Sequence, residues 1–274
     1  MPELPEVEVT RRGIAPTLTG QRVTSTNWRV PALRYPLPRN AAKRFVGLPL
    51  LAVHRRGKYL LLEFASGHLL IHLGMSGSLR LVNPRLDAKK HDHVDLTFGS
   101  GRTAVTLRMH DPRRFGAILW LEGDVDEHPL IGVLGIEPLT DEFTAAWLKK
   151  SLAGLKAGIK PTLMDGHRIV GIGNIYASES LFRAGIHPAT AAGKVSLKRL
   201  TRLVPVIQET LKAAIDAGGS SLRDFIHSDG GSGYFQQQYF VYGRKGEPCR
   251  ICQSPIRELR QAQRATFYCP RCQR

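Results

Sequence analysis

The first eight residues, MPELPEVE, place reactive groups at the N-terminus. If Met1 is removed, which a small second residue permits, Pro2 presents a secondary α-amine. An α-amine has a pKa of roughly 8, against about 10.4 for lysine, so much more of it is neutral and nucleophilic at pH 7. This amine would form a cationic iminium with the C1′ carbon of a sugar. Such a covalent intermediate is the basis of covalent catalysis. Taken alone, however, the pattern favours an ordinary helix start with Pro5, Glu6 and Glu8 in its first turn.

All four cysteines lie in the last 26 residues, as two Cys-x2-Cys pairs separated by sixteen residues. This spacing predicts one structural Zn²⁺ held by Cys249, Cys252, Cys269 and Cys272. Four thiolates leave no position for a water molecule, so the metal should build structure and take no part in chemistry. Two disulfides are the alternative, which the absence of a leader sequence disfavours. The intervening IRELRQAQRATFY predicts a β-hairpin with residues 261–264 at its tip.

The chain is strongly basic, with a net charge of +16 and a pI near 10.1. Residues 1–130 carry 19 Lys and Arg against 12 Asp and Glu, and residues 131–274 carry 20 against 11. Residues 238–274 alone hold eight basic and two acidic side chains. Because both halves are basic, we predict a polyanion lying across two domains. A generally basic protein without such a partner is the plain alternative, and a membrane-surface protein is disfavoured because no Lys-rich amphipathic helix is present.

Hydrophobic patterning divides the chain into a β part and a helical part. A short helix is expected over 6–18, and short apolar or alternating runs between 20 and 122 predict an antiparallel sandwich or barrel. A polar linker over 122–130 precedes a helical region over 131–226, with a Thr–Asp cap at the start of TDEFTAAWLKKSL. A Gly/Ser-rich loop covers 227–238. With no long apolar run and no leader, we expect a cytoplasmic protein without a membrane span.

Seven stretches in order now resemble one family. They are PELPEVE, RRGKYLLLE, LGMSG, KHDHVDL, DPRRFG, GIGNIYASESLFRAGIHP and YGRKGEPC…QRATFYCPRCQ. Together they are similar to bacterial formamidopyrimidine-DNA glycosylases from residue 2 to residue 273. The sister family, endonuclease VIII, usually departs from Leu4 and prefers oxidised pyrimidines, so Leu4 favours the purine-directed branch. One departure is Gly166, where many relatives carry Gln or Asn.

The resemblance implies an α+β fold with three parts. These are an N-terminal antiparallel β-sandwich with its helix (2–122), a helix–two-turn–helix domain (131–230) and a four-Cys zinc-finger hairpin (238–272). It implies a monomeric DNA glycosylase and abasic-site lyase of base excision repair, acting on double-stranded damaged DNA. Such an enzyme excises 8-oxoguanine and formamidopyrimidines and then nicks the strand by β,δ-elimination.

The resemblance also assigns catalytic roles. Pro2 would attack the sugar C1′ and Glu3 would serve as acid or base at the ring oxygen. Lys58 would give the proton of β-elimination, and Arg264 would clamp a phosphate and give the proton of δ-elimination. From the residues alone, Lys58 is a solvated lysine beside a strand and Arg264 is surface charge. Glu6 fits either support of the N-terminus or a plain helix-turn carboxylate.

DNA contacts follow from the same resemblance. His91 and Asn174 are expected at phosphates, with Lys160 and Tyr242 as weaker candidates. A Gly-flanked turn at Asn174 suits this, because it can aim backbone N–H groups at a phosphate.

Three further residues, Met75, Arg113 and Phe115, match a triad that fills the space left by a flipped base. Without the resemblance, Met75 and Phe115 would be assigned to the core. The loop over 227–238 would close over the everted base. Two alternatives stay open: an endonuclease VIII-like enzyme for oxidised pyrimidines, and a non-catalytic zinc-ribbon DNA-binding protein.

Overall fold

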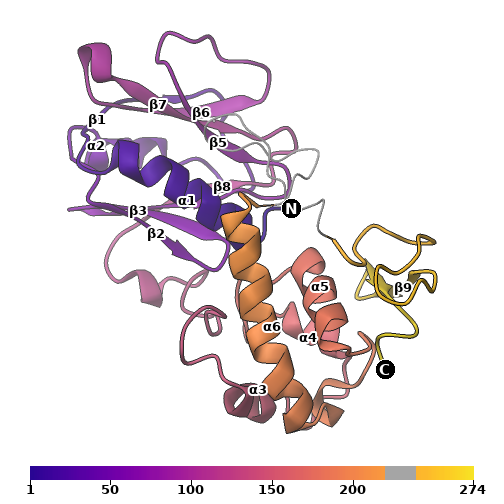
Figure 1. Cartoon of the computed structure of the whole chain (residues 1–274). Coiled ribbons are helices and arrows are strands. Elements are labelled where there is room, and N and C mark those ends of the chain that lie inside the picture. Colours follow the sequence, from indigo (N-terminus) through magenta and orange to yellow (C-terminus); the bar gives the residue numbers. More distant parts are fainter. Residues whose placement is uncertain (220–238) are drawn as a thin grey trace. The chain divides into compact units, whose positions relative to one another are not determined.

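The structure, a computed structural model, describes residues 1–219 and 239–274 (Figure 1). The described residues form two compact units. The first contains residues 1–132 and 217–219, and the second contains residues 133–216 and 239–274. The loop predicted over 227–238 lies outside the described residues, and the three domain boundaries given above stay predictions.

Two four-stranded antiparallel sheets form the first unit, in the orders β1-β6-β7-β5 and β2-β3-β4-β8. Their strands are β1 (Val23–Trp28), β2 (Ala52–Arg56), β3 (Tyr59–Phe64), β4 (Gly67–His72), β5 (Ser78–Val82), β6 (Asp92–Phe98), β7 (Val105–His110) and β8 (Ala117–Leu121). A single cluster of buried apolar side chains draws on both sheets, with Phe98 from one and Leu62 from the other. The predicted β-sandwich is therefore confirmed.

Helix α1 (Leu4–Leu18) contacts β2 and β3 and buries Val7, Ile14 and Leu18 in the sandwich core. It begins two residues earlier than the predicted 6–18, because Pro5 in the first turn fits a helix start without the loss of a hydrogen bond. This packing fixes the residues that precede Leu4. The other short helices of the unit are η1 (Arg39–Ala41), α2 (Ala42–Phe45), η2 (Gly101–Thr103) and η3 (Val125–Glu127).

Helices are the main regular elements of residues 133–216 in the second unit. They are α3 (Ala145–Ser151), α4 (Ile159–Leu163), α5 (Asn174–Ala184), η4 (Ala192–Lys194) and α6 (Leu197–Asp216). The amphipathic α6 contacts α3 and α5 through a buried apolar face. The predicted Thr–Asp cap at residues 140–141 is wrong: the Thr144 hydroxyl accepts the Trp147 N–H at 3.1 Å, while the Thr140 hydroxyl donates to the Glu137 carbonyl in the preceding turn.

The C-terminal hairpin belongs to the second unit and consists of β9 (Arg257–Gln261) and β10 (Arg264–Tyr268). Gln261 and Arg264 face each other across a two-residue turn. Both turn residues, Ala262 and Gln263, have positive φ, at 44° and 63°, as a type I′ turn requires. The predicted hairpin and its tip are confirmed. Within residues 1–219 and 239–274, no helix is long and apolar enough to cross a membrane.

Candidate functional site

Pro2 and Glu3 lie immediately before α1 and are buried, Glu3 being only 2 % exposed. Glu3 is the residue that caps the helix, and its backbone N–H donates to the Glu6 carboxylate at 2.8 Å. Glu6 is fully buried, and Gly219 lies so close that a Cβ there would be 3.4 Å from the Glu6 Oε1. Glu6 thus supports the main chain next to Pro2 by a hydrogen bond, in addition to its place in the first helical turn.

Lys58 lies in the two-residue turn between β2 and β3, where Gly57 supplies a positive φ of 56°. The Gly57 carbonyl accepts a hydrogen bond from Arg55 at 3.0 Å. Arg55 also donates to the Glu8 carboxylate of α1 at 3.2 Å, and that carboxylate receives Arg11 at 2.8 Å. One buried carboxylate on the helix that follows Pro2 therefore holds the hairpin that carries Lys58.

This ion-pair cluster gives a stability prediction. Burial alone raises the pKa of Glu8, but hydrogen bonds from Arg11 and Arg12 outweigh it and hold the pKa below 4.5. A lowered carboxyl pKa stabilises the fold above the unfolded value and loses this contribution as pH falls through the folded value. Glu8→Gln should therefore lower the free energy of unfolding by about 1–3 kcal/mol at pH 7, with a smaller difference from the original chain below pH 4.

Urea denaturation at the two pH values measures that difference. Glu122→Gln is the matched change, because Glu122 pairs with Arg44 on the surface with both side chains more than half exposed. Its effect should stay within about 0.5 kcal/mol. Equal effects of the two substitutions at pH 7 would show that the Glu8 cluster does not hold the hairpin.

His72 is a residue that the sequence analysis missed. It faces Tyr59 across β3 and β4, with ring centroids 4.9 Å apart. Burial, with the positive charges of Lys58 and Arg34 nearby, lowers its pKa to about 4, so the imidazole is neutral at pH 7. Its Nδ1 accepts the Gly74 N–H at 2.9 Å, which places the proton on Nε2. The signal available was a histidine ending an apolar strand two residues before a glycine.

Two loops meet at the end of β4. Gly74, with φ of 67°, lies so close to the β7–β8 loop that a Cβ would be 2.5 Å from the Phe115 carbonyl carbon. Met75 and Phe115 are 40 % and 46 % exposed, and the Arg113 guanidinium lies 4.7 Å from the Phe115 ring centre. The buried Asp111 carboxylate holds the loop by accepting the Gly116 N–H at 2.7 Å. The structure thus brings the predicted triad together on the surface, and the core assignment of Met75 and Phe115 is wrong.

His91 lies beside the start of that loop. It has a φ of 75°, and its carbonyl accepts the Asp111 N–H at 2.9 Å. The next residue, Asp92, is 2 % exposed and accepts Arg80 at 2.7 Å and His110 at 2.8 Å. A buried charged cluster therefore fixes the unusual backbone conformation that presents His91.

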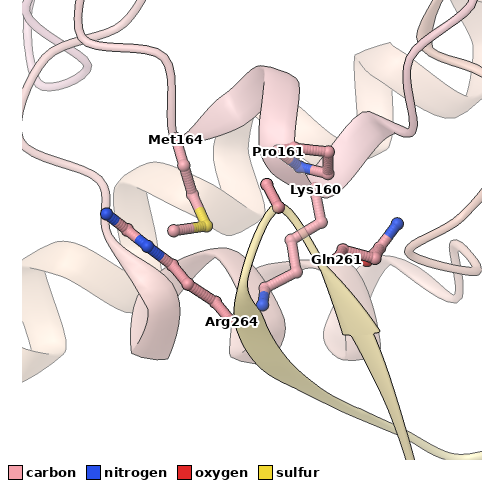
Figure 2. A pocket seen from close by; sticks show the side chains of 6 residues that line it. Lys160, Pro161, Met164, Gln261 and Arg264 are labelled. Atoms are coloured by element: carbon pink, nitrogen blue, oxygen red, sulfur yellow. The ribbon is translucent and has the colours of Figure 1, made fainter.

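In the second unit, Asn174 and Lys160 meet the hairpin. The Asn174 amide donates to the Ala265 carbonyl at 3.0 Å, and the Lys160 ammonium donates to the Asn174 Oδ1 and to Thr266 Oγ1, the latter at 2.8 Å. Lys160 is only 1 % exposed. Figure 2 shows the pocket beside them, of about 190 Å³. It is lined by Lys160, Pro161, Met164, Gln261, Ala262 and Arg264.

Tyr242 is placed by Glu179, another residue that the sequence did not reveal. The Glu179 carboxylate, 2 % exposed in α5, accepts the backbone N–H groups of residues 240, 241 and 242 at 2.8–3.0 Å. Burial raises the pKa of Glu179 despite these three donors. The Tyr242 ring then lies edge-on to Phe267 of β10, 5.3 Å away. Glu179 thereby fastens the start of the C-terminal segment with the four cysteines (residues 239–274, the zinc module) to α5.

The four cysteine sulfurs lie within 4.8 Å of one another. Cys249 and Cys272 have their sulfurs 3.9 Å apart, and Cys252 and Cys269 have theirs 3.4 Å apart. A tetrahedral zinc with bonds of about 2.3 Å places its sulfurs about 3.8 Å apart, so the four thiols fit Zn²⁺. The protein holds one structural zinc at this site.

These features define a class of protein: a β-sandwich with a buried Pro–Glu turn at the start of its first helix, and a helical unit with a basic zinc finger. The chain belongs to the formamidopyrimidine-DNA glycosylase family. Residues 1–118 match the N-terminal domain of that family, residues 134–226 match its H2TH domain, and residues 246–274 match the zinc finger found in FPG and IleRS.

Individual relatives agree with this placement. The formamidopyrimidine-DNA glycosylase of Aromatoleum aromaticum is 58 % identical over the whole of both chains. The crystal structure of the MutM (Fpg) protein from Thermus thermophilus has a TM-score of 0.87 at 38 % identity, covering 99 % of this chain and 98 % of that one. The Lactococcus lactis Fpg, solved with DNA containing an abasic site, has a TM-score of 0.90 at 34 % identity and covers 99 % of each chain.

The departure at Gly166 has little structural consequence. A Cβ built at this glycine meets no heavy atom within 4 Å, and its φ is not in the left-handed region. The Gly166 carbonyl accepts the Gly135 N–H at 2.9 Å, a bond that any residue could make. The Cβ of the Gln or Asn expected in relatives would therefore meet no neighbour here.

Proposed function

We propose that this chain is a DNA glycosylase and abasic-site lyase of base excision repair. It excises oxidised purines, such as 8-oxoguanine and formamidopyrimidines, from double-stranded DNA and then nicks the strand by β,δ-elimination. It acts as a monomer in the cytoplasm of a bacterium. The observation that carries the proposal is the buried Pro2–Glu3 turn at the start of α1, a helix tied through Glu8 and Arg55 to the hairpin of Lys58.

In the first half-reaction, the Pro2 amine attacks C1′ of the lesion nucleotide and the base leaves. Glu3 serves as acid or base at the ring oxygen as the sugar opens. The product is an iminium between Pro2 and C1′, a cation that acidifies the C2′ protons. The buried Glu6 carboxylate accepts the Glu3 N–H, and this hydrogen bond keeps the Pro2–Glu3 turn in one conformation during the attack.

In the second half-reaction, a C2′ proton is removed and the 3′ phosphate leaves. Lys58 gives the proton of this β-elimination, and Arg264 that of the following δ-elimination. The neutral imidazole of His72 adds no second positive charge next to Lys58 at pH 7. Hydrolysis of the iminium then releases Pro2.

Binding precedes both steps and uses phosphates and the base stack. His91, Asn174 and Tyr242 contact phosphates, and Arg264 clamps one of them. Phe115 wedges between bases, Met75 fills the space of the flipped nucleotide and Arg113 hydrogen-bonds the orphaned cytosine. The exposure of Met75 and Phe115 on two loops that meet supports these roles, since apolar side chains that gather on a surface mark interaction sites. The zinc module supplies a rigid, basic hairpin that contacts the phosphate backbone of the DNA.

Borohydride trapping tests the proposal, because it reduces an iminium to a permanent cross-link. The chain should be trapped on duplex with 8-oxoguanine opposite cytosine and not on undamaged duplex. Pro2→Gly should trap poorly, whereas Lys58→Ala should still trap but nick slowly. Efficient trapping of a Pro2-blocked chain would assign the nucleophile to a lysine. Faster cleavage of thymine-glycol than of 8-oxoguanine duplex would favour the endonuclease VIII-like alternative.

A further inference from the structure

The Lys160 ammonium is enclosed by three acceptors in the second unit. Asn174 Oδ1 accepts at 2.5 Å, Thr266 Oγ1 at 2.8 Å and the Ala265 carbonyl at 3.2 Å. A lysine ammonium carries three N–H groups, and these three acceptors lie within hydrogen-bond distance of it. Only 1 % of the surface of Lys160 is exposed, so protein atoms enclose its charge.

The first consequence concerns the side-chain amide of Asn174. A carboxamide has two ends of nearly equal shape, and only its nitrogen can donate to a phosphate oxygen. The cation of Lys160 holds Oδ1, while Nδ2 donates to the Ala265 carbonyl at 3.0 Å. A reversed amide would set its NH₂ against the ammonium. Lys160 therefore fixes the orientation of the Asn174 amide in which Oδ1 faces the ammonium. Nδ2 uses one of its hydrogens for the Ala265 carbonyl and has the second for a phosphate oxygen.

The second consequence concerns the strand that carries Arg264. The Ala265 carbonyl accepts from both Lys160 and Asn174, and Thr266 is fully buried. These bonds join α4 and the start of α5 to residues about 100 positions later in the chain. In Figure 2, Lys160 reaches from α4 to the hairpin, and Arg264 points away from the ammonium.

We infer that Lys160 is a positioning residue that sets the amide orientation of Asn174 and anchors the strand at Arg264, without binding phosphate itself. The inference rests on the proposed function, because its effect is read out through DNA. It replaces the phosphate contact expected for Lys160 from the resemblance. A buried cation is costly unless its hydrogen bonds are all made, which explains why the three acceptors converge on one atom.

Lys160→Met tests the inference, because methionine keeps the length of the side chain and removes the donors. Lys156→Met is the matched change: it removes the same charge four residues earlier from an exposed side chain. Affinity for a duplex with an abasic analogue should fall about tenfold or more for Lys160→Met and little for Lys156→Met. The nicked product should also shift from β,δ- toward β-elimination, because Arg264 loses its anchor.

A double-mutant cycle separates positioning from direct contact. In an Asn174→Ala background, Lys160→Met should cost less affinity than in the original chain, because the part of its effect that passes through the Asn174 amide is already lost. Zinc content, measured on each variant, should stay at one per chain. Additive losses, or equal behaviour of the two lysine variants, would overturn the inference. Failure of the unaltered chain to bind or nick lesion duplex would instead count against the proposed function.

A second variant covers the case in which Lys160→Met does not fold. Asn174→Asp gives the ammonium a carboxylate partner and removes the phosphate donor. Its thermal midpoint should rise relative to Asn174→Ala, while its DNA affinity should fall below that of Asn174→Ala. An Asn174→Asp chain with DNA affinity equal to that of the original would contradict the proposed orientation of the amide.

Discussion

A chain that retains Met1, or carries a tag ahead of Pro2, should bind lesion duplex yet neither excise the base nor become trapped by borohydride. With a residue attached, the nitrogen of Pro2 is a tertiary amide whose lone pair is delocalised into the carbonyl. It can no longer attack C1′. The phosphate and wedge contacts come from other residues, so affinity for an uncleaved lesion should change far less than activity.

The comparison is sharpest on one preparation carrying a removable N-terminal extension. Gel shift measures binding, strand nicking measures excision, and borohydride measures the covalent intermediate, each before and after cleavage of the extension. Mass spectrometry establishes whether Pro2 is the first residue. Activity and trapping should return together once the Pro2 amine is free. If the extended chain nicked 8-oxoguanine duplex at the normal rate, MPELPEVE would be an ordinary helix start.

Sequence reasoning succeeded where a local rule decides the structure. The Cys-x2-Cys pairs require a compact metal knuckle, and the two-residue turn at Ala262 and Gln263 follows from the strands that flank it. The strands of the sandwich were visible because their apolar runs are separated by turn residues. The resemblance supplied Met75 and Phe115, whose exposure local patterning could not reveal.

Sequence reasoning failed where contacts between distant residues decide the environment. Nothing near Lys160 predicts burial, because its acceptors Ala265 and Thr266 lie more than 100 residues away. In the sequence, Glu179 looks like any other carboxylate on a helix. Only the structure shows that three backbone N–H groups of the zinc module donate to it. The lowered pKa of His72 likewise depends on its burial in the folded chain, with the charges of Lys58 and Arg34 as further causes.

Such residues have polar side chains in apolar surroundings, where a partner from another element supplies the hydrogen bond. Chain position alone does not reveal that partner. The misplaced cap has a local cause. Thr140 and Thr144 can both cap a helix, but the Thr140 hydroxyl donates to Glu137 in the preceding turn, and Thr144 caps α3.

Loss of zinc should remove DNA binding before it affects chemistry. In Cys249→Ser the metal should dissociate and the hairpin should lose its order, because few apolar residues stabilise it. Its core contains the fully buried Cys249 and Cys269, with Val241, Ile256 and Phe182. So small a core rarely folds without a metal or disulfide, and zinc binding supplies the missing free energy. Affinity for an abasic-analogue duplex should fall at least tenfold, by roughly 1.4 kcal/mol or more.

Arg264→Ala distinguishes the loss of zinc from the loss of the phosphate contact that the zinc-stabilised hairpin positions. Arg264 lies at the hairpin tip, away from the cysteines, so this variant should keep one zinc per chain. It should lose one phosphate contact, and the slope of log affinity against log salt should become shallower by about one. Metal content by atomic absorption and binding across a salt series measure both effects. Because Pro2 and Glu3 lie in the sandwich unit, both variants should still trap when duplex is saturating. A Cys249→Ser chain that bound abasic duplex normally would show that the hairpin makes no contribution to affinity.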